Sequence, residues 1–339
     1  MISVIIPTFN RFELLNAALA SVAVQSMRGH IEVIVVNDGG PSVAPVVFAW
    51  ENVLAVKLVE LDRRVGPAAA RNVGIKLATG KYIAFLDDDD LFLPEHLAAG
   101  CKLLESDDAD FVYLGALVAD RRLSGLPSNH SEFPLKAYPY DHRFLLVANF
   151  IHTGSVITRN FRHTPVRFDE ALEVCEDWDI WIALTHGLGY RVSFVNQIET
   201  IYHQVPDMVG LVASAQLSSP SKFELARDYI YAKWPSDDPF VLTYREWLIA
   251  FERFRSHLIA RNRPMPNLLF DEILRYLHGR ISHEEKADYA DINRFFDLGD
   301  RSLEELHDRR TAPMSTSPDT NQLDNKIRFS RPVYLEQMP

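Results

Sequence analysis

Short apolar runs alternate with amphipathic stretches through the first hundred residues of the chain. Four runs rich in Val, Ile and Leu predict strands at Ser3–Pro7, Glu32–Val36, Val56–Leu61 and Tyr82–Leu86. Apolar residues at helical spacing follow the first and third runs and predict helices, the first of them with a capping box of Asn10 and Glu13. Strands that are apolar throughout and joined by helices predict an α/β fold with a mostly parallel sheet covered on both faces.

The pattern changes in the second half of the chain. Further strands are predicted at Asp110–Ala119, Gly154–Thr158 and Arg191–His203, further helices at Pro94–Leu104 and Trp178–Leu188, and an irregular loop at Arg121–Asp141. From Pro220 the apolar spacing is helical, and Thr311–Asn325 is almost without apolar residues. We therefore predict an α/β domain over residues 1–215, a helical region over 216–310 and a loosely packed tail over 311–339.

The balance of charge narrows the classes of partner. The 339 residues carry a formal net charge of −11, which argues against nucleic-acid binding because nucleic-acid-binding proteins usually present a basic face. No stretch approaches the roughly 18 uninterrupted apolar residues of a membrane helix, and the N-terminal MISVIIPTFN predicts a strand in place of a signal peptide. Two cysteines, Cys101 and Cys175, indicate free thiols in a reducing compartment. The expected location is the cytoplasm, with peripheral membrane contact left open.

Polar residues follow the predicted strands at three places. Thr8 and Phe9 come after the first strand, Asp38 after the second and Asp87–Asp90 after the fourth. The carboxyl ends of parallel strands share one edge of the sheet, and ligands of such sheets bind beyond that edge. This edge is therefore the candidate site.

The stretch FLDDDDLF, Phe85–Phe92, puts four carboxylates directly after a buried strand. One interpretation is a solvated loop whose last acids favour the positive end of the next helix, with Asp90 capping the turn. The other is a site for a divalent cation, because Mg²⁺ or Mn²⁺ binds one or two carboxylates together with substrate phosphates. Carboxylates, a metal and a diphosphate at a sheet edge are the chemistry of nucleotide-sugar use.

The chain resembles the inverting family 2 glycosyltransferases, which have the GT-A fold. The matching stretches are VIIPTFN at Val4–Asn10, VVNDGG at Val35–Gly40, GPAAARNVGIKLATGKYIAFLDDDD at Gly66–Asp90, RFDEAL at Arg167–Leu172 and EDWDIWIAL at Glu176–Leu184. They extend over about residues 1–205 in the family's order. The resemblance implies a Rossmann-like nucleotide-sugar-binding domain with a mostly parallel mixed sheet, followed by a mainly helical C-terminal region.

The resemblance also implies roles for residues on the donor side. It assigns nucleotide binding to Pro7, Thr8, Phe9, Asn10, Asp38, Arg71, Asp87 and Asp88, and binding of Mg²⁺ or Mn²⁺ to Asp89, Asp87 and His203. Phe9 stands where the family often has Tyr, and Asp88 where it often has Ser or Ala. Structural roles remain open for three of these residues: Asp38 could close a turn, Arg71 could pair with an acid on a helix surface, and His203 could be a buried structural histidine or donate to a phosphate.

The acceptor side needs a base, because an alcohol is a poor nucleophile until its proton is removed. The family pattern places the base at Asp177, with Glu176 orienting the acceptor or a neighbouring side chain. The helix dipole at this position lowers the pKa of a carboxylate and burial near Trp178 raises it. Two helix-capping acids are the alternative. Asp179 is expected on the helix surface.

The predicted function is a metal-dependent transfer of one sugar from a nucleotide-diphospho-sugar, with a UDP-sugar favoured, to a glycan, lipid-linked or small-molecule hydroxyl. A single addition is favoured because the sequence lacks the Gln-x-x-Arg-Trp motif and the membrane helices of processive relatives. Two alternatives remain: a non-catalytic sugar-nucleotide or glycan-binding module, and a nucleotidylyltransferase, which the absence of a glycine-rich loop after the first strand disfavours. The helical region is expected to cover the acceptor or to form a homo-oligomer interface.

Overall fold

The computed structural model describes residues 1–27, 30–205, 221–259 and 269–297. Its strands are β1 Ile2–Thr8, β2 Ile31–Asn37, β3 Ala55–Glu60, β4 Tyr82–Phe85, β5 Leu91–Phe92, β6 Phe111–Ala119, β7 Leu135–Lys136, β8 Val156–Arg159 and β9 Val192–His203. Its helices are α1 Phe12–Ala23, α2 Ala44–Phe48, α3 Pro67–Leu77, α4 His96–Glu105, α5 His142–Val147, α6 Glu176–Ile182, α8 Lys222–Lys233, α9 Pro239–Ile259, α10 Leu269–Ser282 and α11 Ala290–Asp297. Short helical turns lie at His130–Glu132, Thr153–Ser155 and Ala183–Gly187.

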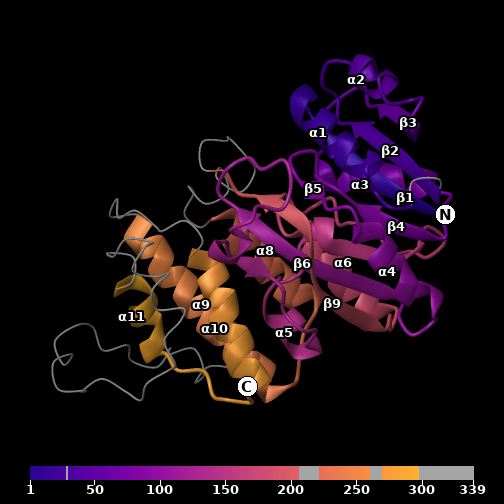
Figure 1. Ribbon diagram of the computed structural model, residues 1–339. Coiled ribbons are helices and arrows are strands. Elements are labelled where there is room, and N and C mark those ends of the chain that lie inside the picture. The colour runs from indigo at the N-terminus through magenta and orange to yellow at the C-terminus, as the bar shows by residue number, and fades with distance from the viewer. Residues whose placement is uncertain (28–29, 206–220, 260–268, 298–339) are drawn as a thin grey trace. The chain divides into compact units, whose positions relative to one another are not determined.

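Among the described residues, the strands form one mixed sheet in the order β3-β2-β1-β4-β8-β6-β9-β5, with β7 paired to β6 (Figure 1). The pairs β1/β2, β2/β3, β1/β4 and β6/β9 are parallel. Antiparallel pairing is confined to β4/β8, β6/β8, β6/β7 and β5/β9. The predicted α/β fold with a mostly parallel sheet is confirmed.

Both faces of the central strands β1, β2, β4 and β6 are buried, which explains why these strands are mostly apolar. Successive side chains of a strand point to opposite faces. In β1, Ile5 packs in a cluster with residues of α3, whereas Val4 and Ile6 pack in a second cluster with residues of α1 and α4. The same alternation recurs in β2 and β4. Helices therefore cover both faces, as predicted.

The helical region extends the core that lies on the α3 side of the sheet. Tyr231 of α8 donates a 2.6 Å hydrogen bond to the carbonyl of Val147, and Arg245 of α9 donates one of 2.8 Å to the carbonyl of Leu146. Buried side chains of α8, α9 and α10 belong to the same apolar cluster as those of α5 and α6. The predicted boundary at residue 215 stays a prediction because residues 206–220 lie outside the described residues, as does the predicted tail 311–339.

Two local predictions are wrong. The capping box of α1 is absent: Arg11 is the N-cap, and Asn10 has a left-handed backbone with φ 54°. The predicted loop 121–141 contains the turn His130–Glu132 and strand β7. The helix predicted over Trp178–Leu188 is present: it begins two residues earlier, as α6 at Glu176, and continues as the π-helical turn Ala183–Gly187.

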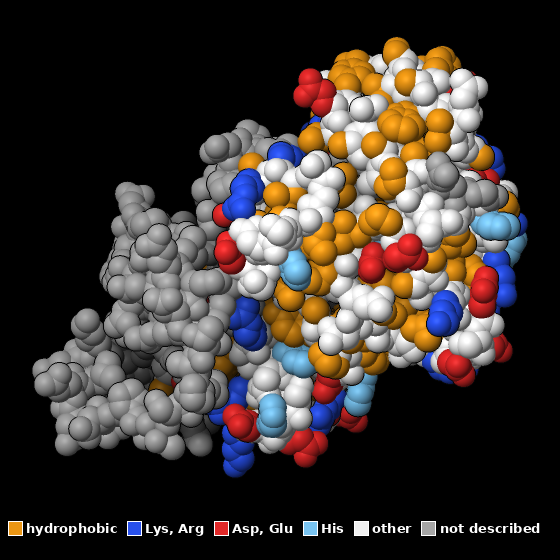
Figure 2. All heavy atoms as spheres, viewed as in Figure 1, with side chains coloured by type: hydrophobic (Ala, Val, Ile, Leu, Met, Phe, Trp, Pro, Cys, Tyr) orange, Lys and Arg blue, Asp and Glu red, His pale blue; other side chains and the backbone are white. Residues whose placement is uncertain are grey.

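The surface over α1 and α2 carries mainly apolar and uncharged side chains, whereas charged side chains gather on the lower part of the same face (Figure 2). Phe48 of α2 is 57% exposed, and Val24, which follows α1, is 59% exposed. Single exposed apolar side chains are ordinary on protein surfaces. No helix in the described ranges combines the length and the apolar composition that crossing a membrane requires.

Candidate active site

The ends of β1, β2 and β4 meet at one edge of the sheet. The backbone N–H of Asp38, which follows β2, donates to the carbonyl of Thr8 at the end of β1 over 2.8 Å. The hydroxyl of Thr8 in turn donates to the Oδ2 atom of Asp88 over 2.7 Å, although the two residues are 80 positions apart. The predicted convergence of the three polar segments is therefore present.

Asp38 anchors the loop that precedes α3. Its carboxylate accepts hydrogen bonds from the backbone N–H groups of Val65 (2.6 Å) and Gly66 (2.9 Å). Gly39 allows this approach: it has φ +74°, and a Cβ atom there would lie 2.2 Å from the carbonyl carbon of Arg63. The Asp38 carboxylate thus holds a distant loop, and the turn before Gly39 and Gly40 is closed by Asn37, whose Oδ1 atom accepts from the N–H of Gly40 over 3.3 Å. A hydrogen bond from a nucleotide base to Asp38 stays a prediction.

The other residues assigned to the nucleotide pocket surround this loop. Phe9 is half-buried, and the guanidinium of Arg64 lies 4.3 Å from the centre of its ring. Pro7 is buried in β1, while Asn10 is exposed. An aromatic ring with a guanidinium on its face leaves a flat, cationic wall beside Asp38.

Arg11 pairs with the two middle aspartates of the acidic stretch. The Nη1 atom of Arg11 lies 2.9 Å from Oδ1 of Asp88 and 3.0 Å from Oδ2 of Asp89. Burial and the neighbouring charge of Asp89 raise the pKa of Asp88 to about 6, and burial and the charge of Asp87 raise the pKa of Asp89. Arg11 thus compensates part of the charge of the acidic stretch without a metal.

Arg71 joins the two acidic segments. Its Nη2 atom donates to Oδ1 of Asp87 over 2.5 Å, and its Nη1 atom donates to Oε1 of Glu176 over 2.6 Å. The side chain is 4% exposed, so a pairing on a helix surface is wrong. Burial alone would raise the pKa of Asp87, but Arg71 outweighs burial and lowers it; at Glu176 burial dominates and the pKa is raised. Contact of Arg71 with a nucleotide stays a prediction.

Asp90 lies deepest of the four aspartates, at 1% exposure. Its Oδ1 atom accepts a 2.8 Å hydrogen bond from the backbone N–H of His203, and its Oδ2 atom lies 3.0 Å from Nε2 of His152 without the alignment of a hydrogen bond. Burial and the charge of Asp89 raise the pKa of Asp90 well above its usual range. Asp90 thus fixes the end of β9, and the expectation that it caps the following turn is wrong.

Both ring nitrogens of His203 face backbone groups. Nε2 accepts from the N–H of Leu123 over 3.1 Å, so Nδ1 carries the proton and donates to the carbonyl of Asp89 over 2.7 Å. Burial lowers the pKa of His203, which favours this neutral form. His203 is therefore left out of the proposed metal ligands, and binding of a metal by this residue stays a prediction.

Asp177 stands at the N-terminus of α6 with both carboxylate oxygens held. The hydroxyl of Thr153 donates to Oδ2 over 2.9 Å, and the backbone N–H of Trp178 donates to Oδ1 over 2.8 Å. Thr153 begins the short turn Thr153–Ser155, where a Cβ atom on Gly154 would lie 2.9 Å from Nε2 of His152. Glycine at this position therefore lets His152 reach Asp90 while Thr153 reaches Asp177.

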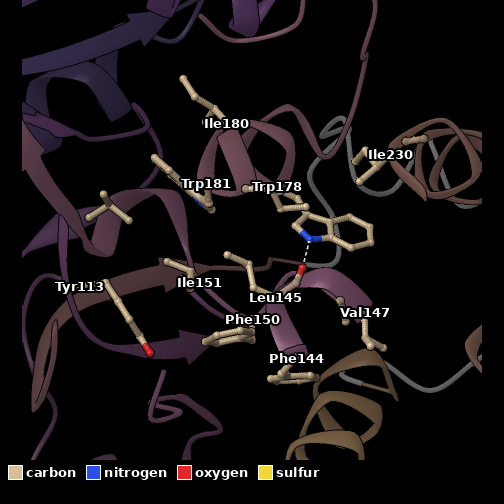
Figure 3. Close-up of a cluster of buried hydrophobic side chains, with 14 of the residues drawn as sticks. Tyr113, Phe144, Leu145, Val147, Phe150, Ile151, Trp178, Ile180, Trp181 and Ile230 are labelled. Carbon is tan, nitrogen blue, oxygen red and sulfur yellow. Dashed lines mark hydrogen bonds between the residues drawn. The ribbon is translucent and has the colours of Figure 1, made fainter. Parts of the chain in front are cut away.

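Packing on every side fixes the orientation of α6. The indole Nε1 of Trp178 donates to the carbonyl of Leu145 over 2.6 Å (Figure 3), and Trp181 packs against Phe85 and Phe111. Asp179 is 1% exposed and accepts from Lys233 (2.8 Å) and Trp234 (2.7 Å). The expectation that Asp179 lies on the helix surface is wrong, because α8 covers that side of α6.

The acidic stretch fits a hard divalent cation that is shared with a substrate. No cluster of three His, Cys, Asp or Glu side chains ready to hold a metal is present in the part of the chain that the structure describes. Mg²⁺ and Mn²⁺ need only one or two carboxylates when phosphates and water supply the remaining oxygens. The side chains of Asp87 and Asp89 are 28% and 26% exposed, whereas those of Asp88 and Asp90 are 6% and 1% exposed. Asp87 and Asp89 are the aspartates that a substrate can reach.

Four site residues escaped the sequence interpretation: Arg11, Arg122, His152 and Thr153. Arg122 donates to the backbone carbonyl of Asp89 over 2.6 Å. Arg11 adjoins the VIIPTFN stretch, so a basic residue just past a strand end was an available signal. The other three come from segments that approach the site through tertiary packing, which no local pattern reveals.

The chain is similar in sequence to known glycosyltransferases. The family model for glycosyl transferase family 2 matches residues 3–196. The uncharacterized glycosyltransferase YwdF of Bacillus subtilis is 34% identical over 207 residues, which are 59% of this chain and 73% of that protein. The succinoglycan biosynthesis protein ExoO of Rhizobium meliloti is 28% identical over 257 residues, which are 72% of this chain and 68% of that protein.

Solved structures share the fold at low identity. Residues 1–349 of S. aureus TarS, in complex with UDP-GlcNAc, match with a TM-score of 0.56 and 19% identity, over 75% of this chain and 72% of that one. The mannosyltransferase PcManGT of Pyrobaculum calidifontis, in complex with GDP-Man and Mn²⁺, matches with a TM-score of 0.50 and 17% identity, over 91% of this chain and 87% of that one. The family match extends over more than half of the chain, so this protein belongs to glycosyl transferase family 2.

Proposed function

We propose that this enzyme transfers one sugar from a nucleotide-diphospho-sugar to an acceptor hydroxyl, with inversion at the anomeric carbon. The observation that carries the proposal is the Arg71 bridge, which ties Asp87 of the acidic stretch to Glu176, the residue before Asp177. Arg71 thereby holds a donor-side acid next to Glu176, the neighbour in sequence of the proposed base. Such proximity is what a direct displacement between two bound substrates needs.

The donor is proposed to bind above the ends of β1, β2 and β4. Its base would lie by Phe9 and Asp38, and its diphosphate near Asp87 and Asp89, which would hold Mg²⁺ or Mn²⁺. Such a cation, when bound, stabilises the charge that grows on the departing diphosphate. The complexes of TarS with UDP-GlcNAc and of the mannosyltransferase with GDP-Man and Mn²⁺ support a nucleotide-sugar donor and the cation. The preference for a UDP-sugar stays a prediction.

Asp177 is proposed as the base. It would take the proton of the acceptor hydroxyl, and the oxygen would then attack the anomeric carbon on the side opposite the diphosphate. The hydrogen bonds from Thr153 and from the N–H of Trp178 fix the carboxylate in one orientation, and Arg71 fixes Glu176 beside it. No residue of this chain needs to form a covalent intermediate in a single displacement.

The test is Asp177→Asn, which removes the base and keeps the shape of the side chain. Thermal unfolding with a panel of UDP- and GDP-sugars and Mn²⁺ first identifies the donor, because a ligand of the folded state raises the unfolding temperature. We expect Asp177→Asn to keep the donor-induced shift and to lose transfer by about 10³-fold or more. Glu173→Gln is the matched control, since Glu173 is exposed and pairs with Lys222. Retained turnover would remove Asp177 from this role.

The remaining parts of the proposal concern partners and location. The name of ExoO supports polysaccharide biosynthesis. A glycan, lipid-linked or small-molecule acceptor stays a prediction. Cys101 and Cys175 are both free thiols, which supports the cytoplasm. Peripheral membrane contact and a homo-oligomer through the helical region stay predictions.

A further inference from the structure

Arg11 holds two of the aspartates in different ways. Both contacts use the same nitrogen, Nη1, at 2.9 Å from Asp88 and 3.0 Å from Asp89. Asp88 is a fixed partner, since its second oxygen accepts from Thr8 and its side chain is 6% exposed. The Asp89 side chain is 26% exposed and that of Arg11 is 29% exposed. A small rotation of Arg11 would therefore break the contact with Asp89 and keep the contact with Asp88.

The backbone makes the position of Arg11 depend on these acids. Arg11 is the N-cap residue of α1, and the positive end of a helix disfavours a cation. The carboxylates of Asp88 and Asp89 offset that cost. A divalent cation at Asp89 would compete with Arg11 for the same oxygen and repel its guanidinium across a part-buried site, where charges are poorly screened.

We propose that Arg11 and Asp88 form an exchangeable counter-ion pair for the donor site. In the donor-free protein Arg11 pairs with Asp88 and Asp89 together. When a divalent cation and a diphosphate bind, Arg11 releases Asp89 to the cation, stays anchored on Asp88 and turns its remaining N–H groups to the diphosphate. This inference rests on the proposed function and gives Asp88, an acid where the family often has Ser or Ala, a role of its own: it keeps Arg11 in the site after Asp89 is taken.

The first test measures the binding of Mn²⁺ alone to the full chain by calorimetry, with free Mn²⁺ followed by electron paramagnetic resonance. Arg11→Gln removes the competitor, so we expect Mn²⁺ to bind about fivefold more tightly than to the wild type. Arg11→Lys keeps a point charge and should stay close to the wild type. Arg121→Gln is the matched control, because Arg121 is exposed and pairs with Asp120. Unchanged or weaker Mn²⁺ binding by a folded Arg11→Gln variant overturns the proposal, as does an absence of Mn²⁺ binding in every variant.

The second test asks whether Asp88 acts through Arg11. Asp88→Asn should weaken Mn²⁺ binding more in the wild-type background than in the Arg11→Gln background, because only in the former does it release Arg11 fully onto Asp89. Equal losses in the two backgrounds would mean that Asp88 contributes charge alone, which contradicts the anchor role.

The third test follows the diphosphate. At saturating Mn²⁺, Arg11→Gln should weaken the binding of UDP about fivefold, opposite in sign to its effect on Mn²⁺ alone. A purely structural Arg11 would weaken both, and unchanged UDP binding would contradict the transfer of Arg11 to the diphosphate. Asp89→Asn separates this inference from the proposed function: if it binds Mn²⁺ as the wild type does, the metal assignment itself fails, whatever Arg11 does.

Discussion

The two acidic segments of the active site are built on different principles. At the end of β4, four consecutive aspartates depend on side chains brought from other elements, with Arg11, Arg71 and the backbone of His203 as partners. At the start of α6, Glu176 and Asp177 depend on a helix whose sides are locked by Trp178, Trp181 and Asp179. The first segment is balanced by charge, and the second is positioned by packing.

The difference matches what each segment has to do. A site that binds and releases a charged donor has to exchange its counter-ions, and a partly exposed arginine such as Arg11 can do so without disturbing the core. A base has to keep one orientation towards the acceptor, and a buried helix end held by hydrogen bonds provides that orientation. Arg71 pairs with an acid of each segment, so replacing it should affect both segments at once.

The largest effect is expected from Arg71→Ala. It leaves Asp87 and Glu176 without the guanidinium that pairs them inside the protein, and removing one partner of a buried ion pair typically costs about 3–5 kcal/mol. Urea unfolding at pH 7 measures the loss of the free energy of unfolding. Adding Glu176→Gln to the variant should recover part of the lost free energy of unfolding, because the buried carboxylate left without a partner is then removed. A loss below about 1 kcal/mol would show that water replaces the arginine.

A smaller effect is expected from Thr153→Val, which sharpens the contrast by loosening the packed segment alone. It removes the hydroxyl that donates to Asp177 and keeps a side chain of similar shape, so kcat should fall about tenfold while KM for the donor stays constant. Thr153→Ser restores the hydroxyl and should restore kcat. An equal loss with Ser and Val would indicate that the methyl group matters and the hydrogen bond does not.

The smallest effect is expected at a carboxylate outside both segments. Burial would raise the pKa of Glu32, but hydrogen bonds from Lys57, Ser3 and Thr79 lower it from the ordinary 4.5 to about 2. The stabilisation is therefore complete above pH 4.5 and is lost as the pH falls towards 2. We expect Glu32→Gln to cost about 1 kcal/mol at pH 7, with the difference from the wild type shrinking below pH 4.5. A difference that is constant from pH 7 to pH 3.5 would contradict the lowered pKa.

Much of the fold could be predicted because its central strands β1, β2, β4 and β6 are buried on both faces and form apolar runs in the sequence. The cores of β1, β2, β3, β4, β6 and β9 lie within the predicted runs. Short elements escaped: α2 has five residues and β5 has two, which is too few for a period to show. The capping box of α1 failed because the chain turns through the left-handed backbone of Asn10, a tertiary requirement that composition does not announce.

The acids of the candidate site could be predicted from the sequence, but the residues that pair with them could not. Strand ends indicated Asp38 and Asp87–Asp90, and the family pattern indicated Glu176 and Asp177. The partners of these acids lie far away in the sequence. Arg11 is 77 residues from Asp88, Arg71 is 105 residues from Glu176, and Thr153 is 24 residues from Asp177. Pairings at such separations follow from sheet order and helix packing, which one sequence does not reveal.

The bonds from α8 to Asp179 have a practical consequence for building chimaeras of this family. The family match ends at residue 196, so the segment beyond it could be taken for an independent unit that can be exchanged between proteins. Yet Lys233 and Trp234, supplied from beyond that junction, are the donors that satisfy Asp179 inside the preceding segment. A graft that brings foreign helices without equivalent donors would leave a desolvated anion two residues from the proposed base, so any transplant should carry Asp179 and its donors as a single unit.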